Sequence, residues 1–351
     1  MSYLDNLDKN IKEYFSILEP DFPNWLEKYI ETKKLLGQQY ISVSCGTIYS
    51  KLYEKRDFYS SLDHSVAVAL IIWYFTHDKK ETLSGLFHDI ATPVFKHSID
   101  FLNGDYMNQE STEDLTSYFI SHDEAVMSML KKDKIKLNEV DDYHIYPIAD
   151  NETPKLSSDR LEYSLSNSLI YHIQNLDDVK EIYNDIEIQK DETNKDELGF
   201  KTLSIAEKFV SVTSKMSVMY RDDRTRYSMQ LLADIVKHLN EDGIITKKDL
   251  YEKKESEIIN IIENSKYKDI FNLWKNAKKI NVSKEEPKKV YYVHHGAKIR
   301  YINPLVNGKR IYDISKKAKE DIDNNLSYDM DNYVYLDFDF PKKKVYKKTV
   351  N

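Results

Sequence analysis

Apolar residues recur at spacings of three and four positions through most of the chain, as in Leu4, Leu7, Ile11 and Phe15. This spacing is the period of an amphipathic α-helix. Glycines are few and no internal repeat is visible, so we predict a mainly α-helical protein. The predicted helices cover residues 3–18, 23–36, 62–76, 80–89, 93–103, 111–131, 157–174, 177–187, 201–220, 225–241 and 247–280.

The pattern changes in the last sixty or so residues. Segment 289–302 has two β-rich runs on either side of His295 and Gly296, which predicts a hairpin, and residues 334–340 alternate as in a half-buried strand. A helix is predicted around 314–322, capped by Asp313 or Ser315. We therefore divide the chain into a helical core with N-terminal helices (1–188), a helical extension (189–285) and a small α+β appendage (286–351).

Composition narrows the choice of protein class. The chain has 351 residues, a net charge of -8 and a single cysteine, Cys45. The charge argues against a binder of duplex nucleic acid with a basic face but is compatible with a small phosphate ligand. The longest apolar run, residues 66–75, is too short to cross a bilayer, and the N-terminus has no signal-like segment. We expect a cytoplasmic protein in a reducing compartment.

The histidines carry the first chemical signal. The dipeptide His-Asp occurs at positions 77, 88 and 122, but only His88 and Asp89 follow an apolar helix and precede a proline, Pro93. They are expected at the inner end of that helix. A buried histidine beside a buried carboxylate is costly unless both find partners, and a metal ion satisfies both.

Two further segments offer metal ligands. His64 opens a segment that is apolar on every side, so it either caps a neighbour or binds a metal. Downstream, Asp159, Tyr163 and Asn167 recur at a spacing of four and share one helix face, which is either a site or a solvated surface.

The ordered set His64, His88, Asp89 and Asp159 resembles the HD-domain superfamily of metal-dependent phosphohydrolases, whose members carry a lone His, a His-Asp pair and a distant Asp. The segments DHSVAVALIIWYF, LSGLFHDIATPVFKH and SSDRLEYSL extend this resemblance over about residues 36–175. It implies an HD-type helical bundle in which these four residues bind a divalent transition metal, with one ion expected and a second one possible.

Within that superfamily, the chain looks most like the deoxynucleoside triphosphate triphosphohydrolase branch. His97 matches its F-x-H element, and Asp159, Arg160 and Tyr163 match its D-[RK]-x-[DE]-Y element. The resemblance implies that Arg160 and Tyr163 bind substrate, with Asn167 beside them, and that His97, His122 and Asp123 are catalytic. The chain departs from the branch where it carries Ser61, Thr92 and Asn167 in place of an arginine, a histidine and an acid.

Two imidazoles and two carboxylates suit Mn, Fe, Zn, Co or Ni. Such an ion activates water and promotes in-line displacement at phosphorus. His97 and His122 would then be general acids or bases, ligands of a second ion, or ordinary core histidines. Arg160 would bind phosphate or simply pair with Glu162 or Glu152.

The predicted function is therefore hydrolysis of a phosphate ester, with a nucleotide as the expected substrate. The three departures favour an alternative, a catalytically weak nucleotide-binding sensor or regulator, and a nuclease would need a basic track that the composition does not show. The sequence is also compatible with a homo-oligomer. Four basic residues near the C-terminus are expected to keep a β edge soluble rather than to face the cleft: Lys298, Arg300, Lys309 and Arg310.

Overall fold

The computed structural model describes residues 2–102, 104–105, 107 and 115–340. It is mainly helical with two small sheets, as the sequence predicted. The helices are α1 (Lys9–Leu18), α2 (Asn24–Ile30), α3 (Lys33–Gly37), α4 (Ser61–Thr76), α5 (Lys79–Phe87), α6 (Ser98–Leu102), α7 (Thr116–Ser121), α8 (Glu124–Lys132), α9 (Ser158–Ile170), α10 (Leu176–Asn184), α11 (Leu203–Met219), α12 (Asp223–Glu241), α13 (Asp249–Glu252), α14 (Glu255–Glu263), α15 (Lys268–Asn276), α16 (Ile311–Ile314) and α17 (Lys316–Leu326). The strands are β1 (Ile186–Lys190), β2 (Asp196–Phe200), β3 (Asn281–Ser283), β4 (Tyr292–Val293), β5 (Leu305–Val306), β6 (Lys309–Arg310) and β7 (Tyr333–Tyr335).

Helix α4 lies at the centre of the larger core. Every residue from Ser61 to Ile72 is buried, which agrees with a sequence that is apolar on all sides. The helix begins with a capping box, in which the Ser60 hydroxyl accepts from the Asp63 amide and the Asp63 carboxylate accepts from the Ser60 amide. This cap fixes the start of the helix one turn from His64.

Helix α5 packs directly against α4, and Gly85 makes the close approach possible. A β-carbon at Gly85 would lie 2.2 Å from Cδ1 of Ile72, so no larger residue fits without a shift. Because α5 ends at Phe87 with His88 as its C-cap, this contact also sets the position of His88 relative to α4.

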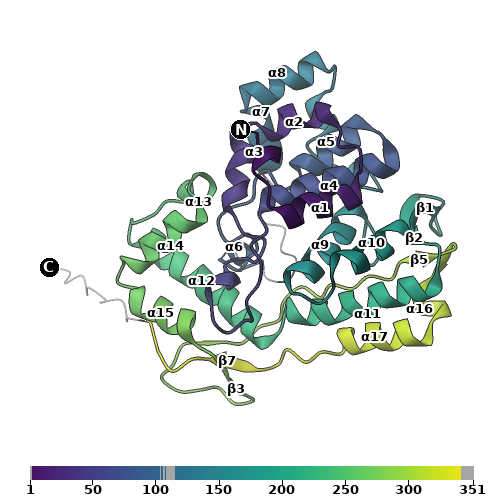
Figure 1. Ribbon diagram of the computed structural model, residues 1–351. Coiled ribbons are helices and arrows are strands. Elements are labelled where there is room, and N and C mark those ends of the chain that lie inside the picture. Colours follow the sequence, from purple (N-terminus) through teal and green to yellow (C-terminus); the bar gives the residue numbers. More distant parts are fainter. Residues whose placement is uncertain (1, 103, 106, 108–114, 341–351) are drawn as a thin grey trace.

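The two largest hydrophobic clusters are built from different sets of helices. One gathers α1, α4, α5 and α9–α11, and the other gathers α12, α14 and α15 with strands β4 and β7. Figure 1 shows α14 and α15 of the second group to one side of the first group, with α12 and α6 on the side that faces it.

The C-terminal segment runs along both groups. One sheet has the order β1-β2-β5-β6 and the other the order β3-β7-β4, so residues after 286 contribute strands to both. Figure 1 shows this segment passing along the lower edge from β3 to β5 and, after α17, back to β7. The division at 188/189 and 285/286 stays a prediction, but the last part does not form a sheet of its own.

Several sequence predictions need correction. The hairpin over 289–302 is wrong, because Val293 in β4 pairs with Val334 in β7 and not with the second run. The hairpin of β1 and β2 was missed, because no strand was predicted before residue 289. The predicted helix over 247–280 is three helices, α13 to α15. For the start of α17, Ser315 is the cap, as one of the two predicted choices.

Helices 93–103 and 111–131 are also shorter than predicted. Residues 94–97 form a turn, with positive φ at Phe95 and Lys96, so α6 begins only at Ser98. The predicted helix 111–131 is interrupted at residues 122–123, where Asp123 caps the start of α8. Residues 111–114 lie outside the described part. Among the described residues, no helix is both long and apolar enough to span a membrane.

Candidate metal centre

His64 and His88 meet at the junction of α4 and α5. Their Nε2 atoms are 3.2 Å apart, and both side chains are almost fully buried. His64 lies in the first turn of α4 and His88 caps the end of α5, so the centre is held by the two helices that Gly85 brings together.

The hydrogen bonds of the two Nδ1 atoms determine which nitrogen carries the proton in each neutral imidazole. Nδ1 of His64 donates to Oε2 of the fully buried Glu162, and Nδ1 of His88 donates to the carbonyl oxygen of Gly85 at 2.6 Å. In the neutral rings, the lone pairs of the two Nε2 atoms therefore face each other. Such a pair is repulsive unless a proton or a metal ion lies between the nitrogens, and an Nδ1–H bonded to a carboxylate or carbonyl is usual for metal-binding histidines.

Two aspartates complete the donor set. Oδ1 of Asp159 is 3.2 Å from Nε2 of His64 and 3.8 Å from Nε2 of His88. Oδ2 of Asp89 is 3.8 Å from both nitrogens. His64, His88 and Asp89 alone already form a group whose ligand atoms lie within 4.8 Å of one another. Two imidazoles and two carboxylates are the donors that divalent transition metals prefer, so these residues fit the predicted ion.

The charges in the centre shift each other strongly. Burial favours neutral His64, but Glu162 and Asp159 outweigh burial and raise the pKa of His64 to about 10. Burial also disfavours the ionised form of Asp89, yet Lys96 and the two histidines hold the pKa of Asp89 well below its usual value. The pKa of Asp159 is likewise lowered, with His64 as the main opposing cause to burial. The protein alone therefore keeps both aspartates ionised.

Lys96 is part of the same cluster. Its Nζ lies 2.5 Å from Oδ2 of Asp89, the oxygen nearest the two histidines. Burial works against a charged lysine there, but the Asp89 carboxylate raises the pKa of Lys96 above its usual value. The ammonium is therefore charged at neutral pH.

A pocket of about 760 Å³ opens from this centre, within the size range of small-molecule sites. The shared face of α9 lines it through Asp159, Tyr163 and Asn167, which excludes the alternative of a purely solvated face. Lys298 and Arg300 line it as well, so the prediction that they only keep a β edge soluble is wrong for these two. The other lining residues that bear on its chemistry are His97, Tyr143, His144, Asp150, Arg160, Tyr171 and Tyr220.

Arg160 is half-buried at the pocket wall. Its guanidinium pairs with Oδ1 of Asp150 at 3.1 Å and donates to the side chain of Asn151 at 2.7 Å. The alternative that Arg160 simply pairs with Glu162 or Glu152 is wrong, because the loop before α9 supplies the partner. These contacts hold the guanidinium beside the pocket. To bind a ligand with all its donors, Arg160 would have to release Asp150 and Asn151 in that loop.

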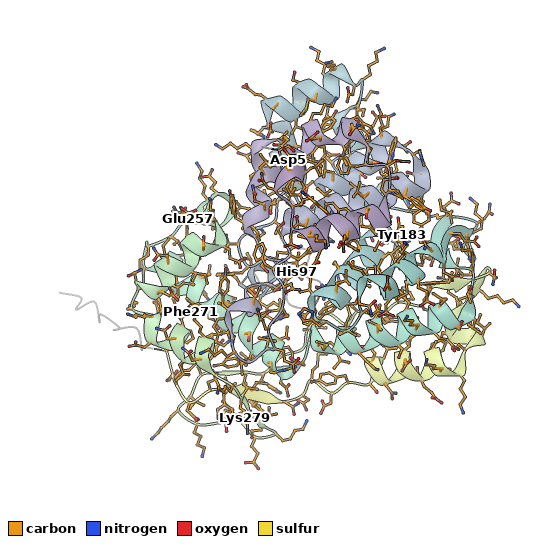
Figure 2. The ribbon with its side chains drawn as sticks, viewed as in Figure 1. Asp5, His97, Tyr183, Glu257, Phe271 and Lys279 are labelled. Carbon is orange, nitrogen blue, oxygen red and sulfur yellow. The ribbon has the colours of Figure 1, made fainter. Side chains whose placement is uncertain are left out.

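His97 also reaches the pocket. Figure 2 labels it near the middle of the molecule. Its Nδ1 lies 2.9 Å from Oδ2 of the fully buried Asp100, which leaves Nε2 for a ligand. Burial lowers the pKa of His97, although Asp100 acts in the opposite direction.

His122 and Asp123 lie outside the pocket. The His122 ring is exposed, stacks on Tyr118 with centroids 4.0 Å apart and has its Nδ1 2.8 Å from the Tyr118 carbonyl oxygen. The Asp123 carboxylate accepts from the Ala125 and Val126 amides as the cap of α8. The structure therefore does not bring them to the other site residues, and we correct the expectation that they lie near the centre.

Sequence reasoning missed several residues of the site. Glu162 was considered only as a partner of Arg160, although its place within the D-R-L-E-Y segment was a usable signal. His144 and Asp150 sit in a polar connection before α9 that has no periodicity, so nothing in the sequence pointed to them. Of the three departures, Asn167 lines the pocket, whereas Ser61 and Thr92 are buried and do not line it.

Comparisons with known proteins support the fold. No protein-family model matches the chain. The uncharacterized protein YdhJ of Bacillus subtilis is 25% identical over 249 residues, which are 70% of this chain and 73% of that protein. A hypothetical protein from Aquifex aeolicus superposes with a TM-score of 0.58 at 14% identity, over 88% of this chain and 91% of the other. A phosphohydrolase from Bacteroides thetaiotaomicron superposes with a TM-score of 0.56 at 13% identity, over 94% and 96%.

Proposed function

We propose that the protein is a metal-dependent phosphohydrolase that acts on a small phosphate ester, and that this ester is a nucleotide. The single observation that carries the proposal is the pair of Nε2 atoms of His64 and His88, which face each other across 3.2 Å with both Nδ1 atoms already bonded. The likeness in fold to a phosphohydrolase agrees with it.

His64, His88, Asp89 and Asp159 would hold the ion, which we expect to be Mn, Fe, Zn, Co or Ni. When bound, such an ion supplies Lewis-acid chemistry toward a phosphoryl oxygen and toward water. The donor set accounts for one ion. A second one would need His97, whose Nδ1 is already engaged with Asp100, to offer Nε2.

His97 is the residue that we assign to proton transfer. Asp100 accepts from Nδ1 and so orients the ring, which leaves Nε2 to give a proton to a leaving oxygen or to take one from water. Burial lowers the pKa of His97, which favours the neutral ring, whose Nε2 can take a proton from water. Asp100 acts here as a positioning residue.

The pocket walls suit a nucleotide. Tyr143, Tyr163, Tyr171 and Tyr220 offer planar faces for a base, and such faces contribute about 1–3 kcal/mol per stacked base in other proteins. Lys298 and Arg300 would donate charge-assisted hydrogen bonds to phosphate oxygens, and Arg160 would do so once it released Asp150.

The test combines metal binding and turnover. The protein loaded with Mn²⁺ should release inorganic phosphate from members of a nucleotide panel, and Asp159→Asn should lose both the ion and the activity. Asp178→Asn is the matched control, because Asp178 pairs with Lys208 on the surface and does not line the pocket. A wild-type protein that binds no divalent metal would refute the proposal.

A nucleotide-binding sensor is the second candidate. It is favoured by Arg160, which is bonded to Asp150 and Asn151 instead of being directed at a ligand, and by the loss of an acid at Asn167. A sensor should show metal-dependent nucleotide binding, seen as a rise in Tm or as assembly into oligomers, with no release of phosphate from any member of the panel.

A further inference from the structure

Lys96 is the unexpected member of the centre. Its side chain is 9% exposed, and its Nζ bonds to the same Asp89 oxygen that lies 3.8 Å from Nε2 of both His64 and His88. The amino group of a lysine thus lies beside the four proposed metal ligands. Neither the proposed metal nor the proposed proton transfer requires it.

The backbone adopts an uncommon left-handed conformation at Phe95 and Lys96, where the Lys96 side chain enters the metal centre. Phe95 and Lys96 have φ values of 66° and 40°, and left-handed backbone costs about 1–2 kcal/mol for each non-glycine residue. The turn is held by hydrogen bonds from the Lys96 amide to the Pro93 carbonyl at 3.0 Å and from the Val94 amide to the Leu250 carbonyl at 2.8 Å. Phe95 is fully buried in the second hydrophobic cluster, whereas Lys96 contacts Asp89 in the metal centre. The two neighbouring side chains therefore lie in different parts of the protein.

A count of formal charges suggests what the lysine does. Asp89, Asp159 and Glu162 bring three negative charges to the centre, and a divalent ion held by neutral histidines would offset two of them. The remaining negative charge would repel a phosphate dianion. Lys96 offsets that charge directly at the Asp89 oxygen, which reduces the repulsion of an anion that approaches the loaded centre.

We propose that Lys96 is a phosphate-binding residue of this centre, and that its ligand class is an oxyanion with at least one dianionic phosphoryl group. The proposal rests on the proposed function, since it takes the four ligands as a metal site. A lysine has three donors, so the ammonium can keep Asp89 and still donate to a phosphate oxygen. The competing view is that the pair with Asp89 only stabilises the fold.

The test separates these views by measuring phosphate binding apart from turnover. Mn²⁺ is titrated into the full-length protein by calorimetry, and inorganic phosphate is then titrated into the Mn²⁺-loaded protein. In Lys96→Met, phosphate should bind at least about tenfold more weakly, while Mn²⁺ binds as tightly as in wild type or more tightly, because a competing cation has been removed. Lys96→Arg, which keeps the charge, should recover part of the phosphate affinity.

Lys28→Met is the control, because Lys28 pairs with Asp133 at 2.6 Å and does not line the pocket. It should leave both titrations unchanged. One measurement needs no variant: phosphate should slow reductive methylation of Lys96 in the Mn²⁺-loaded wild type at least about fivefold. This second readout decides the matter if Lys96→Met does not fold.

The outcomes distinguish the two proposals. Unchanged phosphate affinity in a folded Lys96→Met protein that still binds Mn²⁺ overturns the role of Lys96 and leaves the proposed function standing. Equal methylation with and without phosphate does the same. A wild-type protein that binds no Mn²⁺ overturns both.

Discussion

The carboxylate of Glu162 accepts a hydrogen bond from Nδ1 of His64 and lies three residues after Asp159 on the same helix. One turn of α9 therefore supplies both a proposed metal ligand and the group that orients another ligand. Glu162 also accepts from the hydroxyl groups of Tyr59 at 2.8 Å and Tyr14 at 3.3 Å, so its position is fixed from several sides.

Glu162→Gln should weaken the binding of Mn²⁺ about 10- to 100-fold, because the amide no longer stabilises the tautomer of His64 that presents Nε2. Calorimetric titration measures the effect. The matched control is Glu81→Gln, which alters another buried glutamate, one that accepts from the Ala149 amide and does not line the pocket. Equal metal affinity in wild type and Glu162→Gln would show that His64 does not depend on this partner.

Gly85→Ala should destabilise the protein by about 1–3 kcal/mol and weaken metal binding, because the added methyl group meets Ile72 at 2.2 Å and separates α4 from α5. Urea unfolding and metal titration measure the two effects. Gly37→Ala is the control, since nothing lies within 4 Å of an added β-carbon there. A neutral Gly85→Ala would mean that the two helices adjust without moving His88.

Arg300→Gln should weaken binding of the phosphate ester about tenfold or more and leave metal affinity unchanged, because a charged hydrogen bond to phosphate is lost. The effect should appear in KM or in the Kd of a non-hydrolysed nucleotide. Lys309→Gln removes a charge from the same C-terminal segment at an exposed position outside the pocket and should have no effect. Equal losses in both variants would point to overall charge as the cause.

His97→Ala should lower kcat about 100-fold or more if His97 transfers a proton, with Mn²⁺ still bound. His122→Ala should change kcat by less than about twofold, because its ring stacks on Tyr118 outside the pocket. Steady-state kinetics on the best substrate of the panel decides between them. A large loss in His122→Ala would show that the region around α7 moves toward the pocket during turnover.

Glu255 gives the protein a pH-dependent stability. Burial raises its pKa to about 7, although the Tyr49 hydroxyl and the Ser42 amide favour the ionised form. The folded state therefore holds this proton more tightly than the unfolded chain, whose glutamates titrate near about 4.3. This contribution to stability is complete below that value and is lost as pH rises to about 7 and beyond. Urea unfolding at pH 5 and 8 should show a smaller difference for Glu255→Gln than for wild type, and equal differences would count against this role.

Much of the centre could be predicted because its ligands stand in or beside regular helices. The apolar helix around His64, the end of the helix before His88 and the stripe of α9 all carry a helical period that the sequence displays. Their convergence was inferred by resemblance, since no local pattern specifies how three remote segments meet.

The rest depends on contacts that no local pattern records. Lys96 enters the centre only because two successive residues adopt positive φ, which propensity rules do not anticipate for Phe and Lys. Lys298 and Arg300 reach the pocket through the pairing of β4 with β7 and of β5 with β2, both distant along the chain. His122 and His97 looked alike in sequence, and only the packing around each separates them.

The C-terminal segment supplies strands to both sheets, so the chain cannot be shortened to its helical part without loss of structure. Ending the chain at residue 285 would leave the edge of β2 unpaired, uncover the side of α11 that α17 covers and strip the pocket of the wall that carries Lys298 and Arg300. A shortened fragment would thus be prone to aggregation and would bind ligand poorly for reasons unrelated to the histidines.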